Sequence, residues 1–180
     1  MNEPWFFDSH AHYNTRRFQE DQAQLLESMA DPGIGLIMNV GCDLPSSLQS
    51  IRLAEQYEFI YASVGSHPDD ADHVDAGLVE MYRNLADHPK VMAIGEIGLD
   101  YNERYEYDRQ VQLRYLHDQL ALAQELDVPV IIHDRDAHGD CFEAVLGYPK
   151  LRGVFHSYSG SADMARELTR RGWMIPFSGV

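Results

Sequence analysis

The sequence predicts an α/β fold of the TIM type, a (β/α)8 barrel in incomplete form, with about seven strands and six helices. Short, continuously apolar segments alternate strictly with amphipathic segments, which is typical of a parallel sheet covered by helices. Histidine or glutamate recurs where the apolar segments end, at the edge where barrel active sites lie. A doubly wound open sheet also fits the alternation, but no glycine-rich phosphate loop follows the first strand, which favours the barrel.

Three strand–helix units fill the first half of the chain. The expected strands are residues 6–12, 34–40 and 59–64, and the expected helices are residues 18–30, 45–57 and 76–86. The first helix has its apolar side chains on one face and ends at Asp31-Pro32-Gly33, a sequence that breaks helices. Pro45 suits the first turn of the second helix, where no N–H is needed.

The second half continues the same alternation. The expected strands are residues 91–94, 128–132, 153–155 and 173–177, and the expected helices are residues 107–126, 137–146 and 162–171. No linker or low-complexity segment separates them, and 180 residues suit one sizeable core. We therefore expect residues 1–180 to form a single domain.

Composition limits the classes of function. The net charge is −15, so a phosphate-bearing substrate would have to be drawn locally, by metal ions or a few cationic side chains. No apolar run of about 18 residues predicts a membrane span. The first residues lack the features of a secretory signal, and Cys42 and Cys141 show no paired spacing. The expected setting is reduced and cytoplasmic.

Two histidines close the first expected strand. Because strand side chains alternate faces, His10 and His12 point the same way and make half of a metal site. Glu96, His133 and His156 stand at the ends of later strands. One histidine in such a place is more often a structural group, but a closed barrel aims all of these strand ends at one axis. The joint pattern predicts a metal centre.

The donor types indicate the metal and the chemistry. Neutral imidazoles with one carboxylate suit zinc, manganese, nickel or iron, whereas magnesium normally takes more oxygen ligands. Glu96 is the carboxylate best placed to bridge two ions, which at about 3.5–4 Å apart clamp a phosphoryl oxygen and activate a water. Arg135 follows His133 by two residues and suits a phosphate oxygen; a salt bridge to Asp134 or Asp136 is an equally good interpretation.

Other polar residues receive simpler interpretations. Asp8 shares the face of the first two histidines and is expected to orient one of them. Asp100 and Tyr101 are expected to line the mouth of the barrel. Four further histidines lie in loops or expected helices and are interpreted as solvated: His73, His88, His117 and His138.

Five motifs together resemble the TatD-like metal-dependent deoxyribonucleases, which are amidohydrolase-type (β/α)8 barrels. They are Asp8-Ser-His-Ala-His12, Gly65-Ser-His-Pro68, Gly95-Glu-Ile-Gly-Leu-Asp-Tyr101, His133-Asp-Arg-Asp-Ala137 and His156-Ser-Tyr-Ser-Gly160. The resemblance covers the whole chain, and the motif around Glu96 is its most specific part.

The resemblance implies an activity and roles for individual residues. It implies hydrolysis of DNA phosphodiester bonds by a two-metal-activated water, on single-stranded DNA or 3′ ends. It implies two divalent ions, of magnesium, manganese or zinc-like type, on five ligands: His10, His12, Glu96, His133 and His156. Glu96 would bridge the ions as the catalytic carboxylate, and His67 with Arg135 would contact the substrate phosphate.

The sequence departs from the family pattern in two places. Asp69 follows the His-Pro pair where the family often has a second histidine. The family's last ligand, an aspartate at the end of strand eight, would lie beyond Val180, so the expected domain lacks the eighth strand and its closing helices. A truncated reading frame or a fragment explains this best, and a partner that completes the barrel is the alternative.

Two other functions stay open at this stage. A related metal-dependent hydrolase could act on an ester or amide, such as an aminoacyl ester on RNA, and the strong acidity favours this. A non-catalytic remnant kept for its surface is the third hypothesis, and it rests on the open edge of the predicted barrel.

Overall fold

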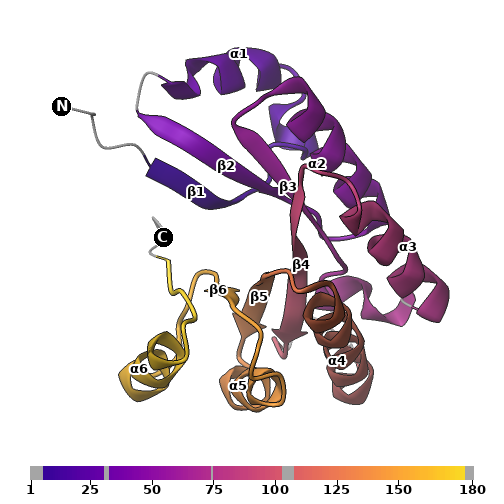
Figure 1. The fold of residues 1–180 in the computed structure, drawn as a ribbon, viewed down its shortest axis with the longest axis vertical. Helices are drawn as coiled ribbons and strands as arrows, with labels where there is room; N and C mark the ends of the chain where they lie inside the picture. The colour runs from indigo at the N-terminus through magenta and orange to yellow at the C-terminus, as the bar shows by residue number, and fades with distance from the viewer. Residues whose placement is uncertain (1–5, 31–32, 74, 103–107, 177–180) are drawn as a thin grey trace.

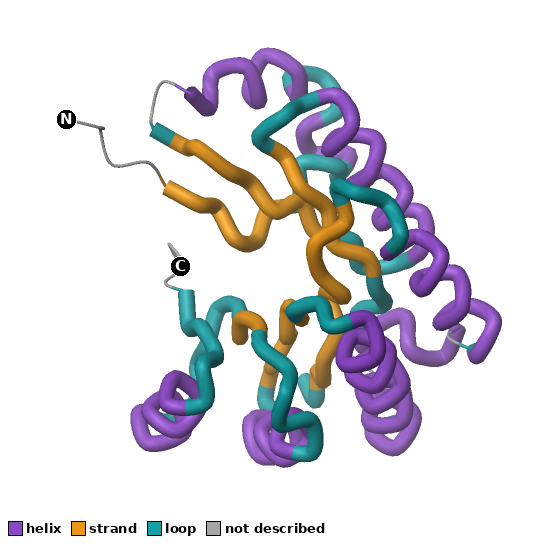
Figure 2. Tube along the Cα trace, in the orientation of Figure 1, coloured by secondary structure: helices purple, strands orange, loops and turns teal. Residues whose placement is uncertain are grey.

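The computed structural model describes residues 6–30, 33–73, 75–102 and 108–176, and its centre is one curved parallel sheet (Figures 1 and 2). The strands are β1 (Phe6–Ala11), β2 (Ile34–Val40), β3 (Ile60–Val64), β4 (Val91–Asp100), β5 (Val130–Arg135) and β6 (Gly153–Phe155). They are paired in the order of the sequence, each with the next. A doubly wound sheet would reverse its strand order part-way, so this order confirms the barrel prediction.

The helices lie on the outer side of the curved sheet (Figure 1). They are α1 (Gln22–Glu27), α2 (Leu44–Gln56), α3 (Ala76–Ala86), α4 (Arg109–Leu126), α5 (His138–Leu146) and α6 (Ala162–Arg170). Short 3₁₀ turns lie at Arg16–Phe18, Ser28–Ala30 and Pro68–His73. Within the described ranges, no helix is long and apolar enough to cross a membrane.

Local capping explains where several helices begin. Asp43 precedes α2 and accepts a hydrogen bond from the backbone of Ser46, whose own hydroxyl accepts one from the Asp43 backbone. The side chains of Asp75, Asp108 and Ser161 each accept one hydrogen bond from a backbone N–H in the first turn of a later helix. These caps place the start of each helix directly after the loop that leaves the carboxyl end of a strand.

Most predicted elements are confirmed, and three differ. The expected helix 18–30 is wrong, because only Gln22–Glu27 is α-helical and 3₁₀ turns flank it. β4 runs to Asp100 rather than residue 94, since it stays paired with β5 up to Asp100 and Arg135. The expected seventh strand is one isolated bridge from Met174 to Val154, and residue 177 lies outside the described residues, as does residue 107 of the expected fourth helix.

The two faces of the sheet pack differently. The outer face and the helices share the large core, which includes Ile37, Leu120 and Phe155. The inner face carries a smaller cluster that lines the barrel interior: Met38, Val40, Ala93, Ile131 and Val154. The period of two in β2 is visible here, because Ile37 belongs to the outer set and Met38 and Val40 to the inner set.

Candidate metal centre

The predicted ligands gather at the carboxyl ends of the parallel strands. His10 lies on β1 and His12 follows its last residue, Glu96 and His133 lie within β4 and β5, and His156 directly follows β6. The structure brings all five together around the carboxylate of Glu96, which is 3% exposed.

Two glycines allow β4 to carry Glu96 so close to β5. A Cβ on Gly98 would lie 1.9 Å from the carbonyl oxygen of His133, and a Cβ on Gly95 would lie 2.7 Å from the Cβ of Ile131. Both glycines also have positive φ angles, 152° and 157°, which other residues rarely adopt. The Gly-Glu-x-Gly spacing therefore serves the close approach of two strands at the centre.

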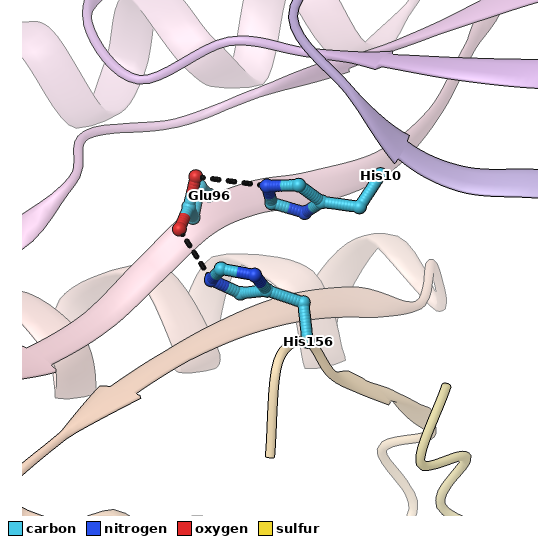
Figure 3. Close-up of side chains that lie close together, drawn as sticks. All are labelled: His10, Glu96 and His156. Carbon is cyan, nitrogen blue, oxygen red and sulfur yellow. Dashed lines mark ion pairs between the residues drawn. The ribbon is translucent and has the colours of Figure 1, made fainter. Parts of the chain in front are cut away.

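The two oxygens of Glu96 face different groups of side chains (Figure 3). Oε1 lies 3.0 Å from Nδ1 of His133 and 2.6 Å from Nε2 of His156. Oε2 lies 3.4 Å from Nε2 of His10 and 3.5 Å from Nε2 of His12. The rings of His10 and His156 are stacked, with centroids 3.9 Å apart, so the two groups are contiguous. We call them the Oε1 group and the Oε2 group.

Hydrogen bonds behind the rings decide which imidazole nitrogen faces Glu96. Nδ1 of His12 lies 3.2 Å from the carbonyl oxygen of Val40 and must donate to it, so Nε2 carries the lone pair when the ring is neutral. Nε2 of His133 lies 3.2 Å from the Asp100 carboxylate, which leaves Nδ1 facing the centre. Such outer partners orient metal-binding histidines.

The electrostatics are those of an anion among imidazoles. Burial alone would raise the pKa of Glu96, but hydrogen bonds from the four surrounding histidines outweigh it and hold that pKa well below its ordinary value. Burial lowers the pKa of His10. His12 and His133 are buried too, yet their bonds to Glu96 raise their pKa values. A cation bound here would displace protons from the ring nitrogens.

The donor set fits divalent metal ions. Tetrahedral bonds of 2.0–2.1 Å place two nitrogen or oxygen ligands about 3.3 Å apart. In the Oε2 group the nitrogens of His10 and His12 lie 2.9 Å apart, and both are within 3.5 Å of the Glu96 oxygen. In the Oε1 group the nitrogens of His133 and His156 lie 3.2 Å apart. Each group therefore has three donor atoms at separations that one ion spans.

Of the two expected phosphate contacts, His67 lies beside the centre and Arg135 lies at the end of β5. His67 Nε2 is 3.8 Å from Glu96 Oε1, and its ring meets that of His133 edge-on. Asp69 bonds to Nδ1 of His67 and so orients it, a role the sequence analysis missed. Arg135 is exposed at the end of β5, and within the described ranges its guanidinium forms no ion pair with Asp134 or Asp136.

Three further residues occupy places that differ from the sequence interpretation. The Asp8 carboxylate accepts a bond from the backbone N–H of His10, not from a ring. Asp100 does not line the mouth, because it is 4% exposed and holds His133. Asp100 follows Glu96 by four residues on the same strand, so the sequence could have predicted that both side chains share one face of the sheet. Cys42, after β2, places Sγ 3.5 Å from Glu96 Oε2, and burial raises the pKa of its thiol.

The other histidines lie away from the centre. His88 contacts Glu55, and His117, which lies on α4, contacts Tyr148. His138 is less solvated than expected, because it bonds to the buried carboxylate of Asp134. The side chain of His73 lies outside the described residues.

A protein-family model described as TatD related DNase matches residues 7–180 of this chain. The chain belongs to the TatD family. Its curated relatives include an uncharacterized metal-dependent hydrolase of Bacillus subtilis, YabD, which is 35% identical over 175 residues. That alignment covers 96% of this chain and 68% of YabD. Another is the 3′-5′ ssDNA/RNA exonuclease TatD of Klebsiella pneumoniae, which is 33% identical over 176 residues. That alignment covers 96% of this chain and 66% of the Klebsiella protein.

A solved structure supports the same assignment to the TatD family. The crystal structure of YjjV, a TatD homolog of Escherichia coli, aligns with a TM-score of 0.85 at 29% identity, over 94% of this chain and 66% of that one. The chain thus spans about two thirds of the length of the proteins it matches. The predicted resemblance is confirmed, and the chain is a TatD-family metal-dependent hydrolase.

Proposed function

We propose that this TatD-family chain hydrolyses phosphodiester bonds of DNA, with single-stranded DNA or 3′ ends as its substrate, and that residues 1–180 act as one domain. The observation that carries the proposal is the Glu96 carboxylate, whose two oxygens face separate groups of imidazole nitrogens. The name of the Klebsiella relative, a 3′-5′ ssDNA/RNA exonuclease, supports the choice of substrate.

In this proposal, each group of ligands would hold one divalent ion. His10 and His12 with Oε2 would hold the first, His133 and His156 with Oε1 would hold the second, and Glu96 would serve both. The imidazole-rich donors favour zinc or manganese over magnesium. When bound, such ions polarise a phosphoryl oxygen and make a water molecule more acidic.

The chain itself contributes position and rigidity. Glu96 is fixed by its buried place on β4, and its backbone N–H donates to the Gly41 carbonyl oxygen at 2.6 Å. Asp100 and the Val40 carbonyl hold two of the rings in the orientation that binding needs. Arg135 would bind a phosphate oxygen through its guanidinium fork, and His67, held by Asp69, would contact the same phosphate from the Oε1 side.

The ester or amide hydrolase is the second candidate, and one observation favours it. The net charge of −15 and the carboxylates near the centre, including Asp8, Asp69 and Asp100, repel a polyanion more than a neutral ester. The same ions would polarise a carbonyl oxygen as readily as a phosphoryl oxygen.

The test measures cleavage of 3′-labelled single-stranded DNA and of an aryl ester, each with Mn²⁺ or Zn²⁺ and with a chelator. We expect metal-dependent DNA cleavage that Glu96→Gln lowers at least about 100-fold, since outer partners of metal ligands alone are worth about 10–100-fold. Glu143→Gln, an exposed site on α5, is the matched control and should cleave normally. Ester cleavage without DNA cleavage would establish the second candidate. Absence of both activities, with no metal bound, would favour the non-catalytic remnant.

A further inference from the structure

The proposed metal centre contains a sulfur atom that the family ligand set does not use. Cys42 lies in the loop between β2 and α2, and its Sγ is 3.5 Å from Glu96 Oε2 and 3.9 Å from the His12 ring at Nδ1. His12, Cys42 and Glu96 each offer a ligand atom, and these atoms all lie within 4.8 Å of one another. The thiol therefore lies beside the Oε2 group, in contact with Oε2 itself.

The backbone holds Cys42 rigidly in this place. Its N–H donates to the Ser46 hydroxyl at 2.8 Å, as part of the start of α2. Its carbonyl oxygen accepts from the N–H of His67, also at 2.8 Å. The preceding residue, Gly41, accepts the bond from the Glu96 backbone. The loop is thus tied to the strand that carries Glu96, and rotation of its own side chain is the main freedom left to the thiol.

We infer that Cys42 is a ligand of the metal ion in the Oε2 group, and that this group is selective for zinc-like ions. The inference rests on the proposed metal centre. A tetrahedral ion with bonds of about 2.3 Å to sulfur and 2.1 Å to oxygen places these ligands about 3.6 Å apart. The observed separation between Sγ and Oε2 is 3.5 Å. The sulfur and the carboxylate oxygen are thus spaced as two ligands of one such ion, and the imidazoles of His10 and His12 would be its other two ligands.

The two groups then differ in their chemistry. Cys42 binds as a thiolate, so the proton of its S–H passes to water as the bond between metal and sulfur forms. A thiolate favours zinc, cobalt or cadmium over manganese and magnesium. Among the described residues of the Oε1 group the donors are nitrogen and oxygen, from Glu96, His133 and His156. The Oε1 group therefore accepts a wider range of ions.

The test is a titration of the metal-free chain with Co²⁺, followed by absorption spectroscopy. We expect the visible bands of tetrahedral Co²⁺ together with a near-ultraviolet charge-transfer band from sulfur. The chain has 2 cysteines, so two variants assign the band. Cys42→Ser should keep visible bands and lose the sulfur band. Cys141→Ala, whose thiol contacts the His133 carbonyl oxygen from the core side, should keep both.

Metal preference provides a second readout that a purely structural role would not change. Cys42→Ser should weaken Zn²⁺ binding at least about 100-fold, the upper end of the loss for outer partners of ligands. Mn²⁺ binding should change by less than about 10-fold, because manganese gains little from sulfur. Equal losses for both ions would overturn the inference.

The outcomes separate the inference from the proposed function. Visible Co²⁺ bands without the sulfur band in the unmodified chain would leave the metal centre intact and reject Cys42 as a ligand. Absence of every Co²⁺ band would reject the metal centre and the inference together. A sulfur band that persists in Cys42→Ser and disappears in Cys141→Ala would also overturn the inference.

Discussion

Gly98 carries the most direct quantitative prediction of the structure. Its hydrogen faces the backbone of β5, and an added Cβ would lie 1.9 Å from the His133 carbonyl oxygen, whereas real Cβ atoms essentially never come within 3.0 Å. An alanine would have to separate β4 from β5 by the difference, 1.1 Å. The Gly98→Ala variant therefore strains the pairing that positions His133.

The cost of Gly98→Ala has two parts. Overpacking of this kind costs about 1–3 kcal/mol. A backbone conformation that only glycine adopts freely, here φ of 152°, adds about 1–3 kcal/mol. The free energy of unfolding should fall by about 2–6 kcal/mol, and at about 2–4 °C per kcal/mol for a domain of this size Tm should fall by at least about 4 °C.

The assay is thermal unfolding followed by circular dichroism, with Gly139→Ala as the matched control. A Cβ on Gly139, in α5, meets nothing within 4 Å. That substitution should stabilise the chain by about 0.5–1 kcal/mol, because alanine favours the helix. If Gly98→Ala unfolds at the wild-type Tm while Gly139→Ala unfolds higher, the close register of β4 on β5 is wrong.

Two further predictions concern the metal and its outer partners. Zn²⁺ at about 100 times its Kd should stabilise the chain by about 2.7 kcal/mol, which raises Tm by about 5–11 °C. A chelator should reverse this shift in Tm. A Tm that no divalent ion changes would contradict the metal centre. Asp100→Asn removes the charge behind His133 and should weaken Zn²⁺ binding about 10–100-fold by calorimetry. Asp163→Asn, on the exposed face of α6, should bind as the wild type does; equal affinities for all three proteins would show that His133 needs no carboxylate partner.

The strand ends could be predicted because their signal is periodic. Histidines two residues apart on a strand must share a face, and parallel strands in sequence order bring their carboxyl ends together. Glu96, His133 and His156 follow the same rule, and the structure places them around one point. Continuous apolar runs predicted the six strands of the sheet in the same way.

The features that the sequence did not predict depend on tertiary contacts, which leave no periodic pattern in the sequence. The segment 18–30 has helical spacing, but Leu26 is the one fully buried side chain of α1, so little packing sustains a longer helix. β4 is longer than its apolar run because its glycines allow continued pairing with β5. Cys42 reaches the centre through a loop, and the direction of a loop follows from hydrogen bonds to residues distant in the chain.

The negative charge of the chain is consistent with the binding of cations at the proposed metal centre. A buried carboxylate such as Glu96 is costly unless cations or hydrogen bonds compensate it, and here histidines supply that compensation. Two divalent ions would bring four positive charges to the same point, which the surrounding carboxylates of Asp69 and Asp100 offset at close range. A net charge of −15 then favours loading of the ions and disfavours nucleic acid until they are bound. The proposed order of binding is therefore metal first and phosphate second.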